Sequence, residues 1–131
     1  MIAVDTSAAI AALFPDPPGG LRERLEDASE LVAPQLIDIE FLHALRRLIR
    51  TGAMSEDRAV ETRREFADLA ISRFPHEPLA DAIWELRENL TAYDAAFVAL
   101  AGALSVPLIT CDSAMAMAPK LAASVELFGS R

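Results

Sequence analysis

The chain has 131 residues and a formal net charge of −8 at pH 7, from 20 acidic and 12 basic side chains. This length fits a single domain spanning residues 1–131 and excludes a multidomain machine. Hydrophobic residues make up 53% of the chain, which supplies a substantial core and argues against intrinsic disorder. The negative charge argues against a protein that holds nucleic acid through bulk electrostatics.

The sequence also narrows the cellular location. The single cysteine, Cys111, cannot form an internal disulfide, so nothing indicates an oxidising compartment. The first residues lack the basic stretch of a signal peptide, and Asp5 interrupts their apolar run. The longest apolar stretch, residues 95–109, is shorter than the ~18–20 residues that cross a bilayer. We therefore expect a cytoplasmic protein that does not enter a membrane.

Short apolar runs alternate with helical patterns along the chain, which predicts βα units and a mostly parallel sheet. In chain order, the expected elements are a strand at 1–4, helices at 6–14 and 21–29, a strand at 31–33, helices at 35–51 and 56–70, a strand at 71–74, helices at 78–86 and 91–104, a strand at 106–110, a helix at 113–118 and a strand at 124–128. Gly52 closes the helix before it, and Ser55 caps the next one, so these two helices form a hairpin.

Two carboxylates directly follow apolar strands. Asp5 ends the first strand and Asp112 follows the strand at 106–110. Ligands of parallel α/β sheets bind beyond the carboxyl ends of the strands, so both side chains are expected to point into one crevice. Each could instead serve only to cap the helix that follows it.

Two further carboxylates lie on helices beside apolar surface. Glu40 falls at the edge of an apolar stripe, where it could instead be satisfied by His43 or Arg47. Asp94 lies in a helix that is otherwise apolar except for a glycine between residues 92 and 104. Thr91 and Asp94 also fit a capping box, and a capping carboxylate can still face a crevice.

Four acids that converge on one pocket repel one another, and a hard divalent cation with oxygen ligands relieves this repulsion. Mg²⁺ is the expected ion, with Mn²⁺ as the alternative. A zinc site is not indicated, because His43 and His76 are far apart in the sequence and Cys111 is alone. The chain has neither a GxGxxG motif nor a P-loop, which removes the main support for nucleotide binding.

The sequence around these acids resembles the PIN-domain ribonucleases, and more closely the VapC-type toxins of type II toxin–antitoxin systems. Five segments carry the resemblance: MIAVDTSA at 1–8, LIDIE at 36–40, ALRRL at 44–48, NLTAYDAAFVAL at 89–100 and LITCD at 108–112. The resemblance implies an α/β fold, a three-layer α/β/α PIN-like sandwich around a central, mostly parallel sheet of about five strands.

The resemblance also implies an activity and a site. The activity is Mg²⁺-dependent endonucleolytic hydrolysis of RNA phosphodiesters. The family's acidic quartet, which supplies both the catalytic residues and the metal ligands, corresponds to Asp5, Glu40, Asp94 and Asp112, with Thr6 and Thr110 lining the same pocket. Relatives often carry a basic residue two positions after the fourth acid, whereas this chain has Ala114, which removes a local phosphate contact.

The resemblance further implies partners: a second copy of the chain in a homodimer, and a small VapB-like antitoxin. Arg46, Arg47 and Arg50 of the helix hairpin are candidates to bind RNA or the antitoxin. The arginines at 58–64 are expected instead to pair with acidic residues of their own helix. Because two Mg²⁺ ions would halve the formal charge of −8, RNA binding is expected to depend on divalent cations and to weaken with salt.

Two alternatives stay open. A non-catalytic PIN-like module that binds RNA or protein would have the same sequence pattern. A phospho-acceptor signalling domain would also have an acidic pocket, but it needs a lysine at the end of its last strand. The only lysine, Lys120, precedes that strand, which disfavours this second alternative.

Overall fold

The computed structural model describes residues 1–118 and 123–129. Its centre is a five-stranded sheet in the order β3-β2-β1-β4-β5, in which all neighbouring strands are parallel. The strands are β1 (Ile2–Val4), β2 (Leu31–Pro34), β3 (Ile71–Phe74), β4 (Leu108–Thr110) and β5 (Val125–Leu127). All five predicted strands are confirmed, and the sheet is wholly rather than mostly parallel.

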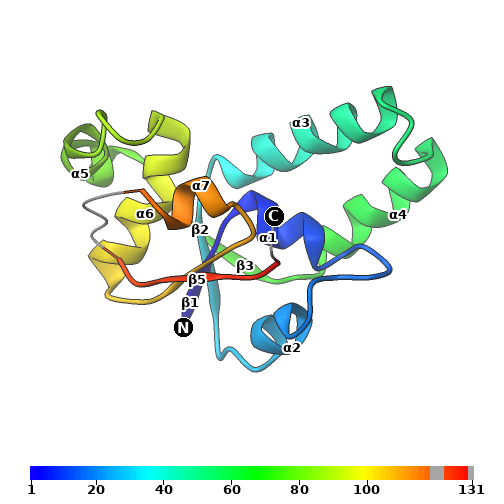
Figure 1. Ribbon diagram of the computed structural model, residues 1–131, viewed down its shortest axis with the longest axis horizontal. Coiled ribbons are helices and arrows are strands. Elements are labelled where there is room, and N and C mark those ends of the chain that lie inside the picture. Colours follow the sequence, from blue (N-terminus) through cyan, green and yellow to red (C-terminus); the bar gives the residue numbers. More distant parts are fainter. Residues whose placement is uncertain (119–122, 130–131) are drawn as a thin grey trace.

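Helices cover both faces of this sheet. They are α1 (Thr6–Ala11), α2 (Leu21–Glu26), α3 (Ile37–Arg50), α4 (Glu56–Ala67), the 3₁₀ turn η1 (Glu77–Leu79), α5 (Ala80–Glu85), α6 (Ala92–Leu104) and α7 (Ser113–Ala116). Helix α6 packs on β1, β2 and β4 and contacts α5 and η1, whereas α1 packs on β4 and α3, which contacts α4. The α3–α4 hairpin and α5 lie at opposite ends of the molecule (Figure 1). The predicted α/β/α fold is confirmed.

Local capping signals set several helix boundaries as expected. Ser55 Oγ accepts a hydrogen bond from the Arg58 N–H at the start of α4, and Gly52 adopts a φ of +78° just after α3. Thr91 Oγ1 likewise accepts from the Asp94 N–H at the start of α6. These contacts join residues three apart, so the sequence alone was enough to locate them. Lys120 lies outside the described residues.

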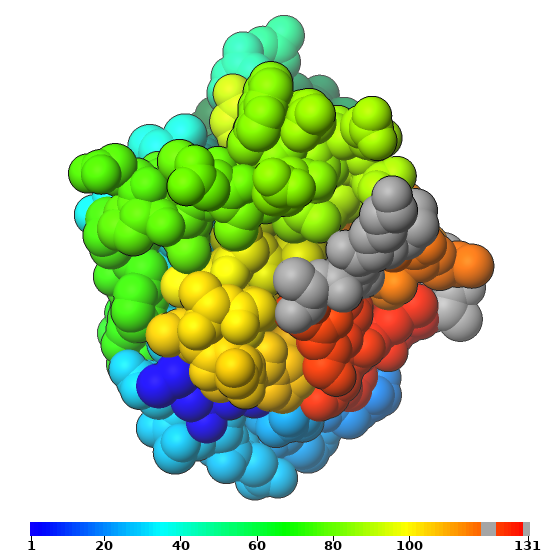
Figure 2. Space-filling model, turned by 90° about the vertical axis from the view of Figure 1, so that its left-hand side faces the viewer, coloured from blue at the N-terminus to red at the C-terminus, as the bar shows by residue number. Residues whose placement is uncertain are grey.

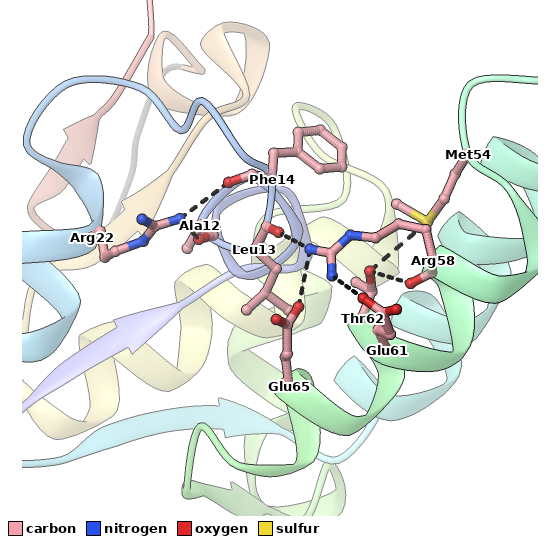
Figure 3. A network of polar contacts seen from close by, with 9 residues as sticks. All are labelled: Ala12, Leu13, Phe14, Arg22, Met54, Arg58, Glu61, Thr62 and Glu65. Carbon is pink, nitrogen blue, oxygen red and sulfur yellow. Dashed lines mark hydrogen bonds and ion pairs between the residues drawn. The ribbon is translucent and has the colours of Figure 1, made fainter.

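The first helix is shorter than predicted, because α1 ends at Ala11 and the chain turns before Pro15. Two arginines satisfy carbonyl groups of this turn (Figure 3). Arg22 Nη2 donates to the carbonyl oxygens of Ala12 and Phe14, at 3.1 and 3.0 Å, and Arg58 Nη2 donates to that of Leu13 at 2.7 Å. The turn is therefore held by α2 and α4, which come later in the chain.

Arg58 also forms the ion pairs that the sequence predicted within α4. Its guanidinium nitrogens lie 3.2 Å from a carboxylate oxygen of Glu61 and 3.0 Å from one of Glu65. The prediction for this arginine is confirmed. Arg58 also holds the turn that follows α1, through its bond to the Leu13 carbonyl oxygen. It therefore links α4 to α1, the helix that Asp5 caps.

Apolar packing joins the two helices of the hairpin. The rings of Phe41 on α3 and Phe66 on α4 stack with centroids 3.9 Å apart, and both side chains are buried. Elsewhere in the molecule, η1 and α5 contact α6, and Figure 2 shows them as a band above the C-terminal part of α6. Within the described residues, no helix is long and apolar enough to span a membrane.

We expect Phe66→Ala to lower the free energy of unfolding by about 3–5 kcal/mol, because it removes a buried ring and leaves a cavity against Phe41. Chemical denaturation followed by circular dichroism measures the change. Val60→Ala is the control, since Val60 lies on the same helix and is 51% exposed. Equal stability losses in the two variants would contradict the proposed packing of the hairpin.

Candidate active site

The strand order of the parallel sheet switches sides between β1 and β4. Strands β2 and β3 extend the sheet on one side of β1, whereas β5 extends it beyond β4 on the other. Ligands of parallel α/β sheets bind at such a switch point, outside the carboxyl ends of the strands. Asp5 directly follows β1 and Asp112 follows β4 by one intervening residue, so both carboxylates lie at this point.

Asp5 is buried, with 3% of its surface exposed. Its Oδ1 accepts hydrogen bonds from the Ser7 hydroxyl at 2.7 Å and the Ala8 N–H at 2.9 Å, and its Oδ2 accepts from the Thr110 hydroxyl. The Ala8 contact makes Asp5 the N-cap of α1. Asp5 thus caps α1 and also lines the pocket described below.

Ser7 takes part in this arrangement although the sequence reasoning did not select it. Its hydroxyl donates to Asp5, accepts from the Cys111 N–H at 2.9 Å and lies 3.3 Å from the Thr110 hydroxyl. The residue thus joins the start of α1 to the end of β4. The available signal was a second hydroxyl residue two positions after a strand-end acid.

Glu40 reaches the pocket from the first turn of α3, where it is half-buried. The Thr6 hydroxyl donates to its Oε1 at 2.6 Å, and Thr6 itself lines the pocket. Among the described residues Glu40 forms no ion pair with Arg47 or His43, the partners considered as alternatives. The charge of His43 nevertheless acts on Glu40 and lowers its pKa, against the larger effect of burial. Thr6 holds the carboxylate because the start of α1 packs against α3.

Asp94 and Asp112 complete the set of acids. Among the described residues no hydrogen bond reaches the Asp94 carboxylate, so its capping box is only half formed, through Thr91. Asp112 Oδ1 accepts from the N–H groups of Ala114 and Met115, at 2.9 and 3.2 Å, and so caps α7. These bonds engage one of its two carboxylate oxygens.

The four predicted acids converge on one pocket of about 580 Å³. The pocket is lined by Asp5, Thr6, Ser7, Ile10, Ile39, Glu40, His43, Ala44, Tyr93, Asp94, Phe97, Asp112 and Met115. Thr110, which was expected to line the pocket, is absent from this lining. It is fully buried behind Asp5, where its hydroxyl also contacts Ser7 and accepts a hydrogen bond from the Asp112 N–H. Arg46, Arg47 and Arg50 are exposed on α3 and lie outside the lining.

Burial and mutual repulsion raise the pKa of three of these acids. Burial raises the pKa of Asp5 to about 6, and the charge of Asp112 adds to the rise. Burial also raises the pKa of Glu40, with a further contribution from Asp94, and that of Asp94, with a further contribution from Asp112. Each carboxylate therefore senses the charge of another, which disfavours ionising all of them without a cation.

The chemistry of these donors fits a hard divalent cation, because all four acids offer carboxylate oxygens. The side chains as positioned do not form a finished ligand shell. Within residues 1–118 and 123–129, no three acidic, histidine or cysteine groups are close enough together to share one ion.

Comparison with known proteins decides the family. The PIN-domain family model matches residues 2–121. The chain belongs to the PIN-domain family. It is 47% identical over 115 residues to ribonuclease VapC9 of Mycobacterium tuberculosis (strain H37Rv), with 86% of each chain covered.

Two solved structures have the same fold. PAE2754 of Pyrobaculum aerophilum superposes with a TM-score of 0.72 at 21% identity, covering 95% of this PIN chain and 81% of that one. VapBC2 of Rickettsia felis, bound to a DNA fragment from its promoter, gives a TM-score of 0.72 at 13% identity, covering 98% and 100%. At these identities the likeness shows the fold alone.

The raised pKa of Asp5 predicts a pH-dependent stability in metal-free protein. The folded state binds a proton more tightly than the unfolded state, where the pKa is near 3.8, so the Asp5 contribution is greatest at low pH and is lost as pH rises through about 6. We expect the difference in free energy of unfolding between the wild type and Asp5→Asn to fall by about 2–3 kcal/mol from pH 4 to pH 7.

Denaturation of both proteins in EDTA at several pH values measures this difference. Asn at position 5 stays uncharged throughout, so subtracting its curve removes the contributions of the other acids. A difference that stays constant from pH 4 to pH 7 would contradict the burial of an ionisable Asp5.

Proposed function

We propose that this PIN protein is a Mg²⁺-dependent endoribonuclease and the toxin of a toxin–antitoxin pair. The observation that carries the proposal is the convergence of Asp5, Glu40, Asp94 and Asp112 on one pocket at the switch point of the sheet. The relatives named as VapC ribonucleases support it. Mn²⁺ is the alternative ion.

The proposed reaction is hydrolysis of an RNA phosphodiester. Asp5, Glu40, Asp94 and Asp112 would hold the metal, directly or through water. Bound Mg²⁺ supplies Lewis-acid stabilisation of the phosphate and a water of lowered pKa.

The remaining roles follow from how each carboxylate is held. Asp5 accepts bonds from three donors and keeps a fixed orientation. The Thr6 bond to Oε1 leaves Glu40 Oε2 for the pocket, and the two backbone bonds to Asp112 Oδ1 leave its Oδ2. Asp94, which no described donor restrains, is the acid best able to adjust to an incoming phosphate or ion.

We expect Asp5→Asn and Asp94→Asn each to abolish Mg²⁺-dependent cleavage while leaving the circular dichroism spectrum intact. Each change removes a negative charge needed to hold the ion and keeps the side-chain volume. Cleavage of a fluorogenic RNA by pure protein measures the effect, with Asp81→Asn as the control because Asp81 is an exposed acid of α5. Full activity in either pocket variant would refute the assignment.

A non-catalytic PIN-like binding module is the alternative function. It would show no cleavage at any Mg²⁺ concentration, whereas the proposed enzyme gains activity as Mg²⁺ is added and loses it in EDTA. The same fluorogenic assay therefore separates the two functions.

The proposed partners are RNA, a small VapB-like antitoxin and a second copy of the chain. One of the matched structures is a VapBC2 assembly on promoter DNA, which supports an antitoxin partner. An arginine of the antitoxin could enter the pocket and neutralise its carboxylates as a metal would. The location proposed for this activity is the cytoplasm.

We propose that Arg46, Arg47 and Arg50 bind RNA or the antitoxin, since all three are exposed and none forms an ion pair with a described residue. Replacing all three by alanine is expected to weaken RNA binding or antitoxin capture at least tenfold. Co-purification with the small protein encoded upstream and RNA-binding titrations measure the two effects. The double variant Arg63→Ala/Arg64→Ala is the control, because these arginines are exposed on α4. Unchanged affinity for both partners would contradict this role.

A further inference from the structure

The carboxylates occupy only part of the pocket. A water molecule takes up ~30 Å³ of liquid, so a bound ion and one phosphate group fill on the order of a few such volumes. The pocket measures about 580 Å³. The rest of its lining is apolar or aromatic, and consists of Ile10, Ile39, Ala44, Tyr93, Phe97 and Met115. A metal ion and a phosphate group would therefore leave the apolar half of the pocket unfilled.

Tyr93 stands at the rim of the apolar half. Its side chain is 66% exposed and it directly precedes Asp94, whereas Phe97, one turn further along α6, is buried. The Tyr93 ring therefore contributes little to the core, although it borders the pocket. Exposed aromatic rings beside a phosphate site are the usual stacking surfaces for unpaired bases.

Helix α3 supplies another part of the lining. Ile39 is 71% exposed and also lines the pocket, and His43 follows it by four residues, which places both on one side of the helix. The apolar half is thus bounded by an aromatic ring on one helix and by an aliphatic and an imidazole side chain on another. A flat, largely apolar group with polar edges, such as a nucleobase, suits these walls.

We propose that the apolar half of the pocket binds one unpaired nucleobase next to the scissile phosphate, with Tyr93 as its stacking platform. The proposal rests on the proposed ribonuclease function. A base inside a duplex cannot present its face to a side chain, so the substrate enters as single-stranded or locally opened RNA. Tyr93 then sets which segment of an RNA reaches the carboxylates.

Base binding can be measured without cleavage. Tyr93 is the only tyrosine and Trp84 the only tryptophan of the chain, so 3-fluorotyrosine and 5-fluorotryptophan each give one ¹⁹F resonance. Nucleoside 5′-monophosphates are added in Mg²⁺, and ribose 5-phosphate, which lacks the base, is added in parallel. We expect the Tyr93 resonance to shift with the nucleotides and not with ribose 5-phosphate.

The Trp84 resonance is the matched control. Trp84 is as exposed as Tyr93, at 65%, but it borders a separate groove formed by η1 and α5. We expect its resonance to stay unchanged in both titrations. Equal shifts of the Tyr93 resonance with ribose 5-phosphate and with nucleotides would overturn the proposal.

Cleavage kinetics give a second test. Tyr93→Ala is expected to raise KM for a single-stranded oligoribonucleotide about five- to a hundredfold, with a smaller change in kcat, because a stacking surface contributes mainly to binding. Tyr93→Phe keeps the ring and is expected to retain the wild-type KM. Trp84→Ala removes an equally exposed aromatic ring outside the pocket and is expected to behave as wild type.

The outcomes separate the two proposals. If wild-type protein cleaves no RNA, the proposed function fails, whereas the ¹⁹F titration still reports base binding. If cleavage is normal and Tyr93→Ala leaves KM unchanged, the base site is wrong. Loss of antitoxin capture in Tyr93→Ala with an unchanged KM would assign the ring to a protein contact and would also overturn the proposal.

Discussion

The structure depends on one buried carboxylate placed where the strand order of the sheet reverses. Asp5 has only 3% of its surface exposed, so hydrogen-bond donors from the protein must take the place of water. Ser7 and Ala8 supply them from α1, and Thr110 supplies one from β4. Satisfying this single group therefore ties the start of α1 to the end of β4. Asp112, two residues after the end of β4, consequently lies close enough for its charge to act on Asp5.

The same contacts serve both folding and the proposed chemistry. Helices α1 and α7 have six and four residues, too few to be stable alone, and each begins at a pocket carboxylate that caps it. Burial and mutual repulsion raise the pKa values of Asp5, Glu40 and Asp94, so ionising these carboxylates together is disfavoured. A cation that binds only the folded pocket would reverse this effect and stabilise the fold by linkage.

The distribution of charge reconciles a net charge of −8 with an anionic substrate. Four of the acids line one pocket, where bound metal would offset them. Several arginines elsewhere form ion pairs. Arg24 pairs with Glu126, Arg58 pairs with Glu61 and Glu65, and Arg73 pairs with Asp38. The exposed arginines of α3, Arg46, Arg47 and Arg50, form no ion pair with any described residue. The net charge of the whole chain is therefore a poor guide to its partners. The local arrangement of the charged side chains determines which partners the protein can bind.

The sequence by itself determined the strands, most helix boundaries and the four pocket acids, because caps, turns and apolar periods act between residues a few positions apart. Ser55, Gly52 and Thr91 show this directly. Only the tertiary structure decided that Ser7 joins the site, that Thr110 lies behind Asp5, and that Tyr93 borders a large apolar half-pocket. The Ser7 and Thr110 contacts join residues 103 and 105 positions apart. Such pairings depend on how the packed sheet aligns α1 with β4, which no local pattern encodes.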